Sequence, residues 1–141
     1  MELTKLIIVA LISLSPVGEE LIAIPAGVAL GLPVFLAAGV AAAANFLPVP
    51  ALFFVFDRGN KYPKIRDWLM RRRNERVQKW MDKYGIFGLF ILAPLTGVYA
   101  ATVTCEMMGM KRVRICGAIG ASLVFYAVII AAMITIGLNP E

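Results

Sequence analysis

Two adjacent carboxylates, Glu19 and Glu20, follow an abrupt break in an apolar stretch of the chain. The break, at residues 15–18, contains a proline, which removes a backbone donor and disfavours helix at the residue before it. An ionisable group at membrane depth is costly unless it is paired or lines a wet cavity. We therefore interpret the two acids as a candidate proton or cation site that gates substrate movement. The alternative is a pair of carboxylates that stabilise the start of a helix.

Other polar groups occur beside similar breaks. Asn45 is the strongly polar side chain of the apolar run 34–56, where it could bond another helix or contact a substrate. Glu106 precedes a basic cluster at 111–114, so an ion pair competes with a buried site there. Backbone groups freed at a break are tolerated in a membrane only when they are buried or line a cavity. The remaining candidates for substrate or ion binding are Pro25, Thr96, Gly97 and Tyr99.

The composition is that of a membrane protein, with 60% hydrophobic residues and a mean hydropathy of +0.81. The net charge is +5, but the basic residues cluster beside apolar runs, which fits membrane topology better than nucleic-acid binding. The chain has no His and no phosphate-binding loop, which excludes Ser/His triads, His-containing metal sites and ATP hydrolysis by this chain. We predict no enzyme activity, no cofactor and no metal, and we expect the two cysteines to be free thiols.

Two parts of the sequence match at an offset of 78 residues. In each part a helix breaker interrupts an apolar run, and a second apolar run follows. Paired interruptions in two halves of a membrane protein indicate a transport site. The matched pairs are Pro16 with Pro94, Ala23 with Ala101, Gly31 with Gly109, and Gly39 with Gly117.

The apolar runs differ in length, and this bears on topology. Residues 3–14 would form a helix only about 18 Å long, short of the roughly 30 Å hydrocarbon core. Residues 21–32 are equally short, and 86–110 are interrupted at Pro94 and Gly97. Residues 34–56 and 115–138 are long enough to span. The first two runs could form one broken spanning helix, or they could form a re-entrant hairpin.

The positive-inside rule favours hairpins, because the loop 57–83 and the cluster 111–114 then share the cytoplasmic side. Every Lys and Arg except Lys5 lies in those two segments. We predict an all-α, polytopic integral membrane protein of one domain, 1–141, in the plasma membrane with both termini outside. Repeat 1 (1–57) and repeat 2 (85–141) would form an inverted repeat, each a re-entrant hairpin plus a transmembrane helix.

Residues 58–84 join the halves, and their apolar residues follow helical spacing from 64 to 84. We predict an interfacial amphipathic helix with aromatics at headgroup depth and basic residues facing anionic lipid. The alternative is a helix that only sets topology. The predicted headgroup contacts are Trp68, Arg71, Arg72, Arg73 and Trp80, together with Arg112 and Arg114.

Several motifs resemble the small multi-drug export protein family over nearly the whole chain. They are Pro16-Val-Gly-Glu19, Asn45 followed by Pro48-Val-Pro50, Pro94-Leu-Thr96-Gly97, and Gly109-Met-Lys-Arg. The resemblance implies that Glu19 is the key acid, with Pro25, Asn45, Thr96 and Gly97 as neighbouring motif positions. It also implies a distant relation to the DedA/VTT superfamily, whose lipid-translocating members carry two facing re-entrant hairpins.

The chain departs from these families at three places. Leu21 stands where the family often has a basic residue, and Ala44 stands where it has glycine. The paired arginines of the DedA second half are absent, since residues 93–101 carry no charge.

The leading hypothesis is transport of a lipid or a small amphiphilic molecule, with proton coupling through Glu19. One alternative is export of small cationic drugs. The other is a membrane scaffold that does not transport and assembles through its Ala/Gly faces. The expected partners are membrane lipids, the substrate, protons and a second copy of the chain in a homodimer.

Overall fold

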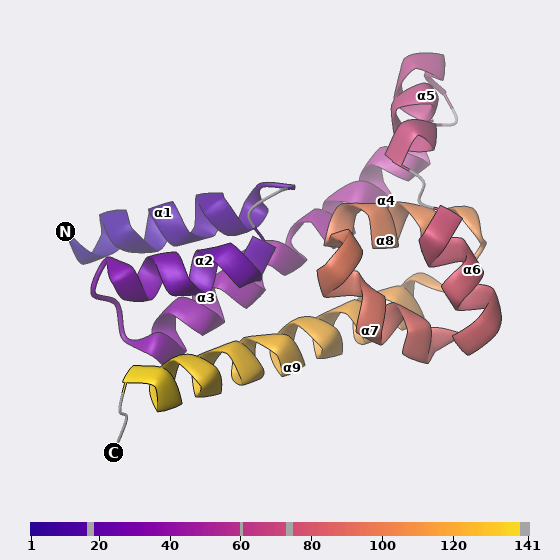
Figure 1. Ribbon diagram of the computed structural model, residues 1–141. Coiled ribbons are helices and arrows are strands. Elements are labelled where there is room, and N and C mark those ends of the chain that lie inside the picture. Colours follow the sequence, from indigo (N-terminus) through magenta and orange to yellow (C-terminus); the bar gives the residue numbers. More distant parts are fainter. Residues whose placement is uncertain (17–18, 60, 73–74, 139–141) are drawn as a thin grey trace. The chain divides into compact units, whose positions relative to one another are not determined.

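The computed structural model describes residues 1–141 except 17, 18, 60, 73, 74 and 139–141 (Figure 1). Every regular element in this described part is an α-helix, which confirms the predicted all-α class. The helices are α1 (Glu2–Leu14), α2 (Glu19–Ala29), α3 (Val34–Phe46), α4 (Pro48–Gly59), α5 (Pro63–Arg72), α6 (Glu75–Tyr84), α7 (Ile86–Thr96), α8 (Val98–Met107) and α9 (Arg112–Leu138).

The chain forms two compact units. Unit 1 comprises Met1–Phe46 and Leu123–Glu141, and unit 2 comprises Leu47–Ser122. Two helical segments of the described chain, Val34–Gly59 and Arg112–Gly137, are long and apolar enough to cross a membrane. The first is α3 followed by α4, and the second is most of α9.

In unit 1 the first three helices lie side by side (Figure 1). α1 ends where Ser15 takes an extended conformation, and α2 begins at Glu19, as the break in the sequence predicts. Gly27 of α2 is where the three helices meet, because a Cβ there would lie 2.8 Å from Val9 of α1 and 2.9 Å from Ala37 of α3. α1 and α2 thus form a hairpin rather than one helix interrupted along its axis.

The same turn closes a helix in each sequence repeat. After α2, Gly31 has φ +84° and its N–H donates to the carbonyl of Val28. After α8, Gly109 has φ +74° and its N–H donates to the carbonyl of Glu106. The following residue in each case donates to a carbonyl five positions back, which completes a Schellman motif. The sequence match at Gly31 and Gly109 is therefore a match of backbone structure.

The second interruption lies at Gly97 and not at Pro94. Gly97 has φ +91° and separates α7 from α8, whereas Pro94 lies inside α7. The predicted break at Pro94 is therefore wrong. Proline leaves the carbonyl four residues earlier without its helical donor, and that carbonyl belongs to Phe90. The hydroxyl of Ser122 on α9 donates to it at 2.5 Å, which lets α7 continue through the proline.

The helix predicted over 64–84 is described as α5 and α6. Residues 73 and 74, between them, lie outside the described part. In α6, Val77 and Met81 are buried within the fold, whereas Trp80 and Tyr84 are exposed. One side of α6 lies against α7 and α8. Only part of the predicted apolar face is therefore available to a membrane surface.

Candidate functional site

Three buried polar side chains come from α1, α2 and α3 of unit 1. Ser13 of α1 is 0% exposed, Glu20 of α2 is 1% exposed, and Asn45 of α3 is 1% exposed. The other buried side chains of unit 1 in the described part are apolar. We call these three residues the break-end cluster, because Ser13 and Glu20 flank the break between α1 and α2.

The helix register places the cluster at one end of the hairpin. The Ser13 hydroxyl donates to the carbonyl of Ala41 at 2.6 Å, so the end of α1 lies beside the second half of α3. Asn45 is one helical turn beyond Ala41. Gly27 of α2 lies beside Ala37 of α3, and α2 and α3 run in opposite directions. The first turn of α2, which contains Glu20, therefore lies at the level of Asn45 near the end of α3.

Asn45 is the cluster member with the clearest unmet bonding capacity. Neither its amide nitrogen nor its amide oxygen has a hydrogen-bond partner among the described residues. Burying an unpaired amide is unfavourable, so such a group indicates a role other than stability. Glu19 begins α2, but its side chain lies outside the described part. Pro25 lies within α2 and is exposed.

The predicted residues of the second half belong to unit 2. Gly97 is buried, and Thr96 and Tyr99 are half-buried. Tyr99 packs against the small core of Leu52 and Val103. Thr102 is 0% exposed, and its hydroxyl has no hydrogen-bond partner among the described residues. The second half therefore also buries a polar group, but one without charge.

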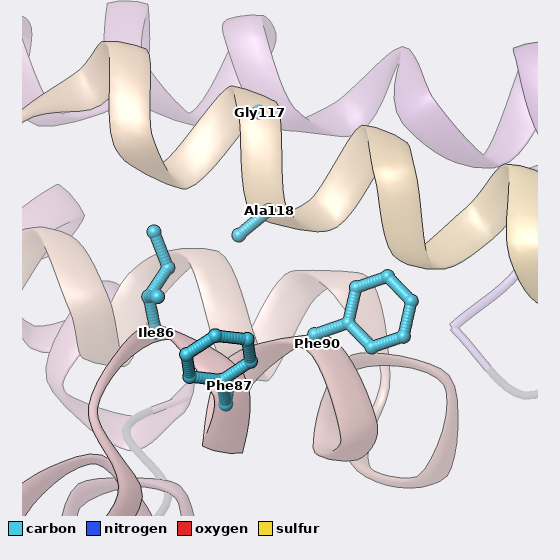
Figure 2. A pocket seen from close by; sticks show the side chains of 5 residues that line it. All are labelled: Ile86, Phe87, Phe90, Gly117 and Ala118. Carbon is cyan, nitrogen blue, oxygen red and sulfur yellow. The ribbon is translucent and has the colours of Figure 1, made fainter.

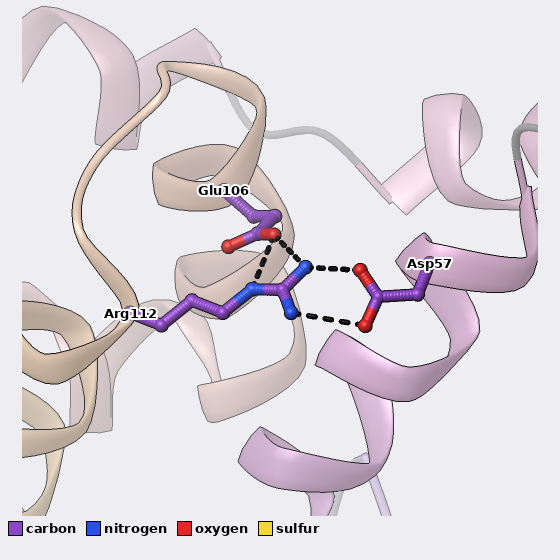
Figure 3. A network of polar contacts seen from close by, with 3 residues as sticks. All are labelled: Asp57, Glu106 and Arg112. Carbon is purple, nitrogen blue, oxygen red and sulfur yellow. Dashed lines mark hydrogen bonds and ion pairs between the residues drawn. The ribbon is translucent and has the colours of Figure 1, made fainter.

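Unit 2 holds an ion network centred on Arg112 (Figure 3). The Arg112 guanidinium donates to both oxygens of Asp57, at 2.7 and 3.0 Å. It also donates twice to one oxygen of Glu106, at 2.6 and 2.8 Å. The ion pair considered for Glu106 from the sequence is thus present. The Arg112 guanidinium also lies 5.1 Å from the ring centre of Phe53.

Each of these charges sits at an unfavourable end of its own helix. Asp57 and Glu106 are near the C-termini of α4 and α8, and Arg112 begins α9. The helix dipole disfavours acids at a C-terminus and a base at an N-terminus. Mutual pairing offsets all three placements. Asp57 is not among the site residues predicted from the sequence; the signal that could have found it is an acid at the end of an apolar run.

The predicted headgroup contacts divide into three groups. Trp68 and Trp80 are 42% and 39% exposed, and Arg71 and Arg114 are also exposed. The side chain of Arg72 and all of Arg73 lie outside the described part. Arg112 is committed to its two carboxylates, so it is not available to a headgroup in this structure.

Comparison with known proteins identifies a family. The family model described as "Putative small multi-drug export protein" matches residues 19–130. No curated protein and no solved structure matches the chain. The match covers most of the sequence, and the chain belongs to this family. Membership supports membrane transport as the general function, rather than enzyme catalysis, and the apolar helices agree with a membrane location.

Proposed function

Starting from this family membership, we propose that the protein moves a small amphiphile bearing a positive charge across the cell membrane. The observation that carries the proposal is the break-end cluster. A buried acid, a buried amide and a buried hydroxyl lie at the same end of three helices of an apolar unit. Intramembrane ionisable residues usually mark substrate or ion pathways.

The sign of the charge favours a cation. The break carries two adjacent acids, Glu19 and Glu20. The only basic residue in the sequence of unit 1 is Lys5, which pairs with Glu2 at 3.1 Å. Lys5 is in the first half of α1, away from the break. A negatively charged site suits a cationic group, and a proton on Glu19 or Glu20 would compete with it.

The lipid hypothesis receives less support for an anionic headgroup. Residues 86–105 carry no charge, and Arg112 is already held by Asp57 and Glu106. A zwitterionic lipid still has a cationic amine that the acids could bind. We therefore place small cations first and keep lipid translocation as the alternative outcome of the test.

The proposed path requires the hairpins to enter the bilayer without crossing it. α1 has 13 residues and is about 20 Å long, which is too short to span. The α1–α2 pairing and the repeated turns at Gly31 and Gly109 support an internal repeat of hairpin plus span. We extend the proposal to an inverted repeat with cytoplasmic 57–83 and 111–114, and to a homodimer.

The test is transport by the purified protein in liposomes, with ethidium as the cationic probe. We expect Glu20→Gln to lose most ethidium movement. Glu75→Gln, which neutralises an exposed acid on α6, is the charge-matched control and should retain it. Glu19→Gln measured at two pH values reports whether this acid couples the movement to protons.

A parallel set of liposomes carries a fluorescent phosphatidylcholine. Movement of this lipid without movement of ethidium would replace the cation proposal with lipid translocation. If the folded wild-type protein moved neither probe, the transport proposal would fail and the scaffold alternative would gain support.

A further inference from the structure

An apolar pocket of about 360 Å³ lies in unit 2 between α7 and the first turns of α9 (Figure 2). It is lined by Ile86, Phe87, Phe90, Gly117 and Ala118. Figure 2 shows the Ile86 side chain extending towards α9, with the Phe87 ring beside it and the Phe90 ring further along α7. The volume is at the lower end of the range for small-molecule sites. None of the lining side chains is polar, so the occupant must present an apolar surface here.

The register of the two helices fixes the direction of the pocket. Ser122 of α9 bonds the carbonyl of Phe90 of α7. Ile86 and Ala118 each lie one turn before these residues, and both line the pocket. α7 and α9 therefore run in the same direction at this place, and the N-terminal ends of both helices lie at the same end of the pocket.

A basic side chain lies on the pocket face of α9 at that end. Arg114 is three and four residues before Gly117 and Ala118, so it shares their face of the helix. Arg114 is exposed, and its guanidinium makes no hydrogen bond or ion pair with any residue that the structure describes. Arg112 points about 200° away around the helix and is paired. Of these two arginines, Arg114 is the one available to a ligand.

Aromatic side chains lie near the end of the pocket where α7 and α9 begin. Trp80 and Tyr84, at the end of α6 that leads into α7, are exposed, and their ring centres are 4.8 Å apart. The ammonium group of Lys83 lies 5.2 Å from the Tyr84 ring centre. α6 packs tightly against α7 here, because a Cβ on Gly88 of α7 would be 2.9 Å from the Trp80 carbonyl oxygen. Exposed Trp and Tyr beside basic residues are typical of the headgroup level of a membrane.

We propose that this pocket holds an acyl chain of an anionic phospholipid whose phosphate pairs with Arg114. The apolar lining accepts the chain, and the charge at one end selects the headgroup. The lipid is a bound ligand of unit 2 and is separate from the cation proposed to move through unit 1. Anionic lipids are the chemistry of the cytoplasmic leaflet, where the proposed topology puts residues 111–114.

The experiment is native mass spectrometry of the detergent-solubilised protein incubated with either dioleoyl-phosphatidylglycerol or dioleoyl-phosphatidylcholine. The wild type should bind the anionic lipid about fivefold more strongly, as expected for one basic residue at an anionic surface. Arg114→Gln should remove this preference. Arg66→Gln, at an exposed position on α5, is the charge-matched control and should keep it.

Gly117→Leu tests the pocket itself. A side chain at Gly117 has open space, since nothing lies within 4 Å of a Cβ there, so the variant should fold and fill the pocket. It should lose binding of both lipids at least fivefold. Gly137→Leu is the matched control, because Gly137 is on the same helix with equally open space.

Equal binding of the two lipids by the wild type, or unchanged binding by Gly117→Leu, would overturn the proposal. Glu20→Gln separates this inference from the transport function. It should leave lipid binding unchanged even where ethidium movement is lost.

Discussion

Arg112 shows how a single residue can hold three helix ends of unit 2 together. It forms an ion network with Asp57 of α4 and Glu106 of α8 from the start of α9 (Figure 3). The side chain of Glu106 is only 13% exposed, whereas those of Arg112 and Asp57 are 40% and 60% exposed. The pairing with Glu106 should therefore matter more for stability than the better solvated pairing with Asp57.

Arg112→Gln should destabilise the protein by about 1–2 kcal/mol, because it leaves the carboxylate of Glu106 without its cation. The stability of Arg112→Lys should lie between those of the wild type and Arg112→Gln, since an ammonium group cannot reproduce the bidentate geometry. Unfolding of the protein in detergent measures the effect, with Arg114→Gln as the control. Equal unfolding midpoints for Arg112→Gln and Arg114→Gln would contradict a structural role for the network.

Asn45 is expected to lower the stability of the protein while supporting transport. Its amide is buried without a partner among the described residues, so Asn45→Leu should stabilise the protein by about 1 kcal/mol or more. The same change should reduce ethidium transport, because it removes a polar group of the break-end cluster. Asn45→Ala serves as the control for lost volume. A lower unfolding midpoint for Asn45→Leu than for the wild type would indicate that the amide is bonded after all.

At the level of elements, several of the described helices are short for a membrane protein. α1, α2, α7 and α8 have 13, 11, 11 and 10 residues, and none of them could cross a bilayer alone. Small residues let such helices approach closely, and Gly27 does this for α1, α2 and α3. Gly31 then ends α2 before the long apolar segment Val34–Gly59, and Gly109 ends α8 before α9.

Gly31→Ala and Gly109→Ala should each cost about 1–2 kcal/mol, since an L side chain is strained at their φ values of +84° and +74°. Gly31→Asn and Gly109→Asn should cost less, because asparagine tolerates this conformation better. Gly39→Ala is the control: it is helical with open space, and it should stabilise by up to about 1 kcal/mol. The same unfolding assay applies. If only one of Gly31→Ala and Gly109→Ala lowered the stability, the two turns would not be equivalent.

At the scale of the whole molecule, the proposed topology depends on where the charges lie. Hairpins that return to their side of entry put the loop 57–83 and residues 111–114 together, and broken spanning helices would separate them. Charge placement favours the first arrangement. The hairpin of α1 and α2 in unit 1 is consistent with it (Figure 1).

Single cysteines in a Cys105→Ser, Cys116→Ser background test this topology. Lys61→Cys and Lys111→Cys should react with a membrane-impermeant maleimide from the same side, and Lys5→Cys from the other. The measurement is labelling of intact and of opened cells. If Lys111→Cys labelled together with Lys5→Cys, the four-span arrangement would replace the proposed one.

The sequence by itself determined the helical class, the break after Leu14, the two long apolar segments and the repeat at Gly31 and Gly109. These follow from local chemistry, since hydropathy, proline and glycine act over a few residues. The family could also be recognised from motifs within short windows, and the match over residues 19–130 confirms it.

Only the tertiary structure decided which polar groups meet. Glu106 pairs with Arg112 and Asp57, and Asp57 is far away in the sequence. Pro94 does not break α7, because a hydroxyl of a distant helix replaces the missing donor. The burial of Ser13, Glu20 and Asn45 at one end of unit 1 likewise depends on the antiparallel register of α1 and α2. Such contacts arise from packing between helices, and a residue's type and local spacing do not specify its partner across the fold.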